Sequence, residues 1–254
     1  MNWKNTLIKT QDVIEIWVKV QKLWQYLQPI FFSEDIIHQM PKEGVKYQAA
    51  DKIWRTIMEN THKHPNVLEA CAAPKIKETF INCLDLLEQV IKGLNDYLNT
   101  KREAFPRFYF LSNDELLSIL AQTKEPKAVQ KHLSKCFEGI EYLTFQNDLT
   151  ITHMNSLEDE SVPFNRIVSP LDKDGNPRSV EEWLMDVEKT MKSTLRETFF
   201  KSLEDYVKKD RKKWLFDWPA QIVVVADQTL WTSMVEEAIN TRKAKNNSLQ
   251  EAFE

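Results

Sequence analysis

Apolar residues recur every three or four positions through the first hundred residues, which is the spacing of amphipathic helices. The first stripe follows Thr10, the expected N-cap, and Pro29 is expected to end its helix. This stripe consists of Val13, Ile16, Trp17, Val20, Leu23, Trp24 and Leu27. A shorter helix is expected to start near Ser33, and the next helix is expected to carry Ile53, Trp54, Ile57 and Met58.

The longest stripe begins after Pro74, which suits a first helical turn because its missing N–H has no intrahelical partner there. Its members are Ile76, Phe80, Cys83, Leu84, Leu87, Val90, Ile91, Leu94, Tyr97 and Leu98. This helix is expected to stop at Phe105 and Pro106, since a residue before proline is disfavoured in helical geometry. Ser112 and Glu115 then form a capping box, in which each side chain satisfies a backbone amide of the other, and a further helix is predicted to follow.

The period of the pattern changes to two in the middle of the chain. Apolar and polar residues alternate through 149–154 and again through 162–164, with polar residues between them. This pattern predicts a β-hairpin near 149–168, inserted in an otherwise helical chain. Pro163 places the second strand at the edge of its sheet, because proline has no N–H to donate to a neighbouring strand.

Helical spacing returns after the hairpin. Ser179 and Glu182 form a second predicted capping box, and the helix behind it has a stripe of Val180, Trp183, Leu184, Val187, Met191, Leu195, Phe199, Leu203 and Val207. About 30 residues at 1.5 Å per residue make a rod about 45 Å long. A last, buried helix is expected from Trp218 to Ile239, and the tail beyond Arg242 is expected to start another. The pattern therefore predicts a mainly α protein with a helical-bundle portion at 1–104 and a second helical portion, with the hairpin, at 105–254.

The composition narrows the class of partner. A net charge of −4 argues against nucleic acid, and the basic run at 208–213 is either a solvated helix end or a polyanion site. Cys71, Cys83 and Cys136 are too few for a closed disulfide framework, which favours a reducing compartment. Neither a signal peptide nor an apolar run of about 18 residues is recognisable. We expect a soluble intracellular protein that binds no membrane.

The motifs of nucleotide and metal sites are incomplete. Each of the four glycines is isolated in the sequence. This excludes the phosphate loop and the dinucleotide fingerprint, because both motifs use several nearby glycines to bring the backbone close to a phosphate. His62, His64, Cys71 and Cys83 are the residue types that bind zinc, and the turn at 172–176 resembles a calcium loop. Neither has the spacing of its class of site. We therefore expect no metal and no cofactor in this chain.

Two further patterns favour packing over chemistry. His132 and Cys136 lie four residues apart on one helix face, but no nucleophile signature accompanies them, and a packing pair is the default interpretation. The tryptophans fall on the same stripes as the leucines and isoleucines, which indicates core packing, with an exposed docking face as the alternative. No catalytic residue is predicted.

One stretch of the chain resembles a family signature. Residues 101–117, K-R-E-A-F-P-R-F-Y-F-L-S-N-D-E-L-L, closely resemble a signature of the linker of dynein heavy chains. Five further blocks resemble the same family in the same order: 24–36, 94–98, 135–140, 180–184 and 221–232. The sequence at 33–41 is more similar to axonemal heavy chains, of the inner-arm type, than to cytoplasmic ones.

The resemblance implies a function that the composition does not. In dyneins the linker arches over a ring of AAA+ modules and swings as ATP is bound and hydrolysed. It implies an elongated helical-bundle linker whose partner is the AAA+ ring of the same heavy chain, with microtubules reached only indirectly. ATP and Mg would be bound by the ring, and the start of the linker and its connection to the ring would lie outside these residues. The expected location is the cytoskeleton, in the axoneme of a cilium or flagellum.

The candidate site is the junction inside the signature. Its residues are Phe105, Pro106, Arg107, Phe108, Tyr109, Phe110, Ser112 and Glu115. The four aromatic side chains are expected to seal the core around it, and the arginine to pair with an acid or to stack on a ring. The junction is either a hinge or an ordinary packed corner between helices.

Three hypotheses remain for the function of the chain. The first is a mechanical lever, for which a Walker motif would be expected in the sequence that follows. The second is a helical adaptor that binds a partner without transmitting force. The third is an enzyme of unknown chemistry, which would need a pocket with convergent, perturbed side chains.

Overall fold

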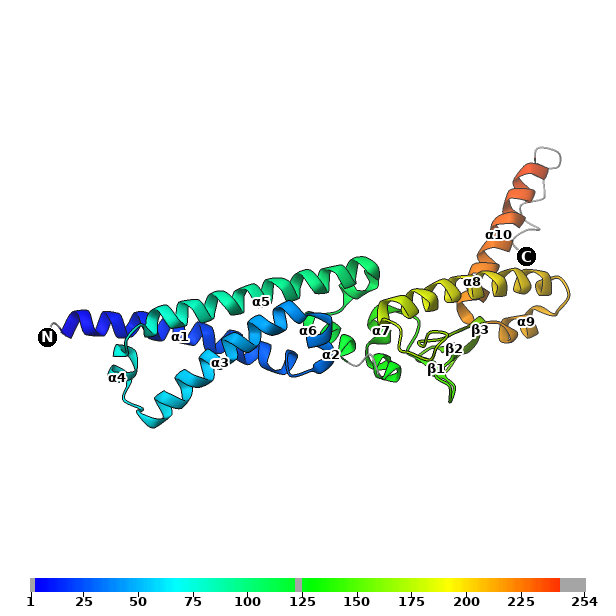
Figure 1. Ribbon diagram of the computed structural model, residues 1–254. Helices are drawn as coiled ribbons and strands as arrows, with labels where there is room; N and C mark the ends of the chain where they lie inside the picture. The colour runs from blue at the N-terminus through cyan, green and yellow to red at the C-terminus, as the bar shows by residue number, and fades with distance from the viewer. Residues whose placement is uncertain (1–2, 122–124, 243–254) are drawn as a thin grey trace. The chain divides into compact units, whose positions relative to one another are not determined.

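The computed structural model of the chain describes residues 3–121 and 125–242 (Figure 1). The chain forms two compact units: unit 1 is residues 1–136 with 179–181, and unit 2 is 137–178 with 182–254. It is mainly α with a small antiparallel sheet, which confirms the predicted fold class. The helix break at residue 105 lies inside unit 1. The further helix expected beyond Arg242 falls outside the described residues.

Three long helices form the body of unit 1. They are α1 (Trp3–Ile30), α3 (Pro41–Lys63) and α5 (Ile76–Ala104), and both α1 and α3 pack along α5 (Figure 1). The buried face of α5 consists of Phe80, Cys83, Leu87, Val90, Leu94 and Leu98. All of these lie on the predicted stripe, so the helical spacing located the core correctly.

Aromatic rings join the three helices. Trp24 of α1 stacks on Trp54 of α3 with the ring centroids 5.6 Å apart, and Trp17 of α1 lies 5.0 Å from Phe80 of α5. The indole N–H of Trp24 donates to Asp51 Oδ1 at 2.8 Å, which satisfies its polar group at the edge of the core. These tryptophans therefore pack between helices, as their spacing predicted.

The helix ends differ from those expected. Thr10 does not cap α1, because the helix starts at Trp3 and the Thr10 hydroxyl donates to the carbonyl of Thr6 at 3.0 Å, one turn earlier. Pro29 lies in the last turn of α1 and not beyond it. A proline here is compatible with helix because the groups it leaves unbonded are near the helix end.

Short helices connect the long ones in unit 1. The segment near Ser33 forms α2 (Glu34–Gln39), and α4 (Val67–Ala72) is a helix that the pattern did not predict. The side chain of Asn66 caps α4 by accepting from the amide of Leu68 at 3.0 Å. The end of unit 1 contains α6 (Asn113–Leu120), the 3₁₀ helix η2 (Pro126–His132) and α7 (Leu133–Cys136).

The sheet of unit 2 has strand order β1-β2-β3, with β1 at Tyr142–Phe145, β2 at Ile151–Asn155 and β3 at Ser161–Val168. The predicted hairpin is β2 with β3, and Pro163 lies on the edge strand, as predicted. Strand β1 is an addition, paired antiparallel with β2. Leu149 is not part of a strand, since it occupies the turn between β1 and β2 with φ of 65°.

Helix α8 (Val180–Tyr206) follows the sheet and lies over it in unit 2 (Figure 1). Its 27 residues span about 40 Å, close to the predicted rod. Val207, the last member of the predicted stripe, lies beyond the helix and is 84% exposed. Helix α9 (Arg211–Asp217) returns along the end of α8, where the indole N–H of Trp214 donates to the carbonyl of Ser202 at 2.8 Å.

The last helix, α10 (Ala220–Arg242), confirms the prediction of a helix from Trp218 to Ile239. The prediction that it is buried was wrong. Ile222 and Ala226 are buried, but Val224 is 54% exposed and Trp231 is 53% exposed. The apolar residues of α10 lie all around its axis, and Ala238 near the end of the helix is also buried.

None of the helices within 3–121 and 125–242 combines the length and the apolar character that crossing a bilayer requires.

Candidate functional site

The predicted junction is a sharp corner between two helices of unit 1. Helix α5 ends at Ala104, Phe105 has extended backbone, and Pro106 begins the 3₁₀ helix η1 (Pro106–Phe110). The amide of Phe108 donates to the carbonyl of Phe105 at 3.0 Å, which closes the first turn after the break. The proline therefore ends α5 where the sequence predicted, and the residues after it form a short 3₁₀ helix that was not predicted.

The four aromatic residues of the corner divide into two pairs. Phe105 and Phe108 are fully buried, with their rings edge to face and the centroids 5.0 Å apart. Tyr109 is 62% exposed and Phe110 is 70% exposed. Only the first pair fills the core, so the expectation that all four would seal it was wrong for the second pair. In a turn of about three residues, side chains three apart share a face, and 105 and 108 are three apart.

Two arginines tie the corner to its surroundings. Arg107 donates to the backbone carbonyl of Cys136 at 2.9 Å, a kind of partner that the sequence did not suggest. Arg102 was not among the predicted site residues, yet its guanidinium donates to the carbonyl of Leu111 at 3.2 Å and to Asn113 Oδ1 at 2.8 Å. It also lies over the ring of Tyr109, 6.0 Å from the centroid. Arg102 thus spans the corner, from α5 to the start of α6.

The predicted capping box is present at the start of α6. The amide of Glu115 donates to Ser112 Oγ at 3.3 Å, and the amide of Ser112 donates to Glu115 Oε2 at 3.0 Å. The ammonium of Lys135 also bonds to the Glu115 carboxylate. Hydrogen bonds from Lys135 and Ser112 lower the pKa of Glu115 from 4.5 to about 2.

The cysteine and histidine of the predicted packing pair lie beside this corner. Burial raises the pKa of the Cys136 thiol to about 11, so the thiol stays protonated and is a poor nucleophile at neutral pH. Burial also lowers the pKa of His132. Within the described part of the chain, no group of three or more His, Cys, Asp or Glu side chains is placed to hold a metal ion. The candidate zinc ligands differ in solvent exposure, since His62 and His64 are exposed and Cys83 is fully buried.

A mostly buried ion pair also involves the last turn of α5 in unit 1. Lys101 bonds to Glu181, and the two side chains are only 19% and 10% exposed. The Lys101 ammonium lies 5.5 Å from the ring centroid of Tyr97, and the pKa of Tyr97 is raised by burial and then by the Glu181 charge. The second carboxylate oxygen of Glu181 is buried and has no hydrogen-bond partner among residues 3–121 and 125–242. The sequence offered no signal for this pair, because its members are 80 residues apart.

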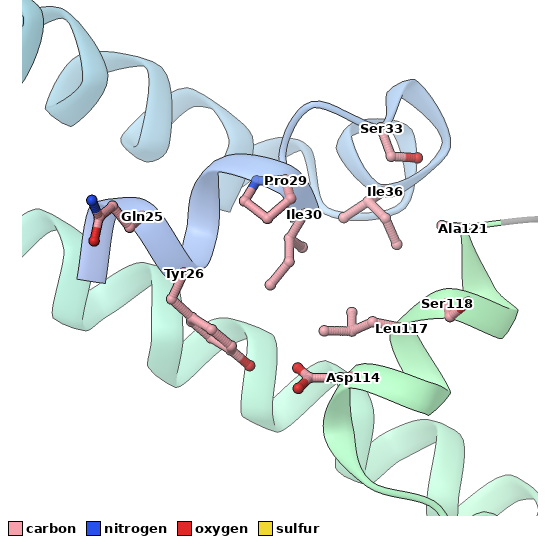
Figure 2. Close-up of a pocket in the computed structure, with 10 residues that line it drawn as sticks. All are labelled: Gln25, Tyr26, Pro29, Ile30, Ser33, Ile36, Asp114, Leu117, Ser118 and Ala121. Atoms are coloured by element: carbon pink, nitrogen blue, oxygen red, sulfur yellow. The ribbon is translucent and has the colours of Figure 1, made fainter. Parts of the chain in front are cut away.

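Helix α6 also forms one wall of a cleft (Figure 2). The cleft has a volume of about 450 Å³ and is lined by Gln25, Tyr26, Pro29, Ile30, Ser33, Ile36, Asp114, Leu117, Ser118 and Ala121. Its walls are the end of α1, the start of α2 and one face of α6. In Figure 2 the Tyr26 ring and the Asp114 carboxylate approach each other at one end, while Ile30 and Leu117 point into the space between the walls.

The comparisons with known proteins agree with the resemblance. The family model described as "Dynein heavy chain, N-terminal region 2" matches residues 1–202. The chain is a mainly helical region of a large motor protein's heavy chain, and it belongs to the dynein heavy chain family.

Its relatives are axonemal heavy chains. The chain is 45% identical over 238 residues to dynein axonemal heavy chain 1 of Mus musculus, which is 94% of this chain and 6% of the relative. It is 46% identical over 237 residues to dynein axonemal heavy chain 3 of Homo sapiens, covering 93% of this chain and 6% of that protein. Dynein axonemal heavy chain 12 of Mus musculus is 46% identical over 238 residues, 94% of this chain and 8% of the relative. The chain therefore spans less than a tenth of the length of these relatives.

Proposed function

We propose that this chain is a mechanical linker segment of an axonemal dynein, of the inner-arm type, which acts as a lever between the AAA+ ring and the rest of the motor. The ring of the same heavy chain binds ATP with Mg and is the direct partner, and the microtubule is reached only through other parts of the motor. The segment itself performs no catalysis. Its location is the axoneme of a cilium or flagellum.

The observation that carries this proposal is the packing of three long helices along one another in unit 1. A single helix bends readily, whereas α1 and α3 both brace α5 along its length. A Cβ added at Gly93 of α5 would lie 2.6 Å from Cγ of Glu43, so the side chain of Glu43 in α3 lies directly against α5 there. A braced rod of 29 residues transmits a displacement of one end to the other, which a lever requires.

The test makes α5 more flexible without changing its buried residues. Glu88 and Gln89 are exposed in the middle of α5. Replacing both with glycine costs about 1 kcal/mol of helix stability per site relative to alanine. In the parent motor we expect Glu88→Gly/Gln89→Gly to slow microtubule gliding while ATP hydrolysis continues, because a more flexible rod transmits less of the ring's movement.

The matched control is Glu88→Ala/Gln89→Ala, which removes the same side chains and keeps a strong helix former. It should leave both gliding and ATP hydrolysis unchanged. If the glycine variant glides at the control rate, stiffness of α5 is not needed and the lever proposal fails. If both variants lose ATP hydrolysis, the segment acts on the ring and not as a passive lever.

We propose the corner at residues 105–115 as a structural junction and not as a hinge. Burial of Phe105 and Phe108, together with the bonds that Arg102 makes across the corner, supports this choice. A hinge needs residues that change backbone angles at low cost, and a packed corner resists such change. If Arg102→Gln leaves gliding normal and the corner is seen bent differently in two nucleotide states, the hinge hypothesis replaces ours.

The alternative function, a helical adaptor without force transmission, is favoured by one observation. Helix α10 exposes about half of Trp231, Met234 and Ile239, and exposed apolar side chains on one helix are typical of binding faces. An adaptor predicts that the glycine and alanine variants of α5 behave alike in gliding, whereas the lever predicts that they differ.

A further inference from the structure

The ion pair between Lys101 and Glu181 lies inside unit 1, where it joins the end of α5 to the first turn of α8. Both side chains are mostly buried, and Val180, next to Glu181 in α8, is buried as well. Removing two charges from water costs about as much free energy as their attraction returns, so a buried pair of this kind adds little net stability.

The pair is also not the strongest contact that these two positions allow. Lys101 bonds to Oε1 of Glu181, whereas Oε2 is buried and has no hydrogen-bond partner in the described part of the chain. A buried acceptor without a partner costs free energy. An arginine could donate to both oxygens through its guanidinium, which a lysine does less well. Stability alone therefore does not explain the pair.

The surroundings of the pair restrict its geometry. The Lys101 ammonium lies 5.5 Å from the ring centroid of Tyr97, one turn earlier on α5, and the phenol of Tyr97 donates to Gln39 Oε1 in α2. Burial raises the pKa of Tyr97, and the Glu181 charge raises it further, so the phenol stays protonated and remains a donor. Polar contacts thus run from α2 through α5 to α8. Each requires a defined distance and direction, whereas an apolar contact is non-directional.

We propose that Lys101 and Glu181 form a latch, which fixes how the first turn of α8 lies against the end of α5 and passes movement from one helix to the other. The latch contributes little to the stability of the fold. Glu181 is the last residue of α8 in unit 1, since Glu182 belongs to unit 2, so the latch holds α8 where the chain leaves unit 1. This inference rests on the proposed function, because a lever must pass movement on, and it goes beyond that function by naming the residues that do so.

The first test removes both charges in the full-length heavy chain. Lys101→Met/Glu181→Leu, the apolar variant, replaces the pair with uncharged side chains of similar size. We expect it to lose gliding velocity while ATP hydrolysis continues, because an apolar contact no longer fixes one geometry. Lys101→Arg keeps the ion pair and should glide like the wild type. The matched control is Lys77→Met/Asp12→Leu, which removes an exposed pair between α5 and α1 and should leave gliding and ATP hydrolysis unchanged.

Hydrogen exchange in the same heavy chains measures the stability of the contact. Peptides that cover 184–187, the second turn of α8, report whether the start of the helix stays folded. Lys101→Met alone leaves the Glu181 charge buried without its partner, so exchange in these peptides should become about 100-fold faster. In the apolar variant, exchange should stay within about fivefold of the wild type, because only the small effect of an acid near the helix N-terminus is lost.

The outcomes separate the latch from a structural support and from the lever. Wild-type gliding in the apolar variant overturns the latch, as does loss of its ATP hydrolysis or loss of gliding in Lys101→Arg. Exchange in the apolar variant as fast as in Lys101→Met also overturns it, because the pair would then stabilise the fold. The glycine variants of α5 judge the lever independently. Normal gliding in those variants, together with lost gliding in the apolar variant, would keep the latch and reject the lever.

Discussion

The two units of the chain bury their long helices with different chemistry. In unit 1 the buried face of α5 contains only apolar side chains. In unit 2 the buried residues of α8 include Thr190, Thr194 and Ser202. A buried hydroxyl is costly unless it is hydrogen-bonded, so α8 needs partners at defined positions where α5 needs only apolar area.

The partners of the hydroxyls of Thr194 and Ser202 lie in a strand and in α8 itself. Thr194 Oγ1 accepts from the amide of Asn165 in β3 at 3.0 Å and donates to Asn165 Oδ1 at 3.1 Å. The hydroxyl of Ser202 donates to the carbonyl of Phe199 at 2.8 Å, and the Ser202 carbonyl accepts from Trp214. Unit 1 is therefore stabilised mainly by non-directional burial, while unit 2 depends on a few directional bonds. Four measurements test this contrast between the units.

The largest expected effect is the loss of a buried ring in unit 1. Phe108→Ala should destabilise the chain by about 3–5 kcal/mol, because it removes a fully buried ring and leaves a cavity beside Phe105. Phe110→Ala, on the same short helix but 70% exposed, should change stability by less than about 0.5 kcal/mol. Urea unfolding of the two variants measures the difference. Equal effects would show that the corner is not packed as described.

The second effect is the loss of a directional bond in unit 2. Thr194→Val keeps the shape and removes the hydroxyl that bonds to Asn165, so we expect a loss of about 1–2 kcal/mol. Thr229→Val is the control, since the Thr229 hydroxyl bonds only to its own helix and is exposed. A neutral or stabilising Thr194→Val would mean that burial alone holds α8, and the contrast between the units would disappear.

The third effect is that of an exposed hydrogen bond in unit 1. Ser112→Ala removes the cap of α6 and should cost about 1 kcal/mol, the usual value for such a cap. Thermal unfolding followed by circular dichroism measures it. Ser118→Ala, exposed on the same helix without a capping role, should be close to neutral. A cost for Ser112→Ala that exceeds the cost of Thr194→Val would reverse the expected order of the units.

The smallest effect depends on pH and concerns Glu115. Its pKa is about 2 when folded and 4.5 ordinarily, so its charge stabilises the folded state fully above pH 4.5. The contribution is lost as the pH falls from 4.5 toward 2, because the unfolded chain then binds the proton more readily. Unfolding at a series of pH values should show Glu115→Gln less stable than the wild type at pH 7, with the gap closing below pH 4.5. If the difference in unfolding free energy between Glu115→Gln and the wild type did not depend on pH, the effect would come from the shape of the side chain and not from its charge.

Local patterns were enough to locate much of the fold. Helical spacing identified the face of α5 that contains its buried residues, and the proline and the capping box located the corner between α5 and α6. Period-two alternation found the hairpin of β2 and β3, and Pro163 identified its edge. These features depend on residues within a few positions of one another, so the sequence carries them directly.

Other features depended on contacts between distant residues. The sequence alone determined that Phe105, Phe108, Tyr109 and Phe110 lie at a helix break, whereas the tertiary structure decided that the first two are buried and the last two exposed. It likewise decided the exposure of α10, the addition of β1, the pairing of Lys101 with Glu181 and the cleft that Asp114 shares with Tyr26. The physical reason is that periodicity states which side chains share a face, while burial depends on which element covers that face.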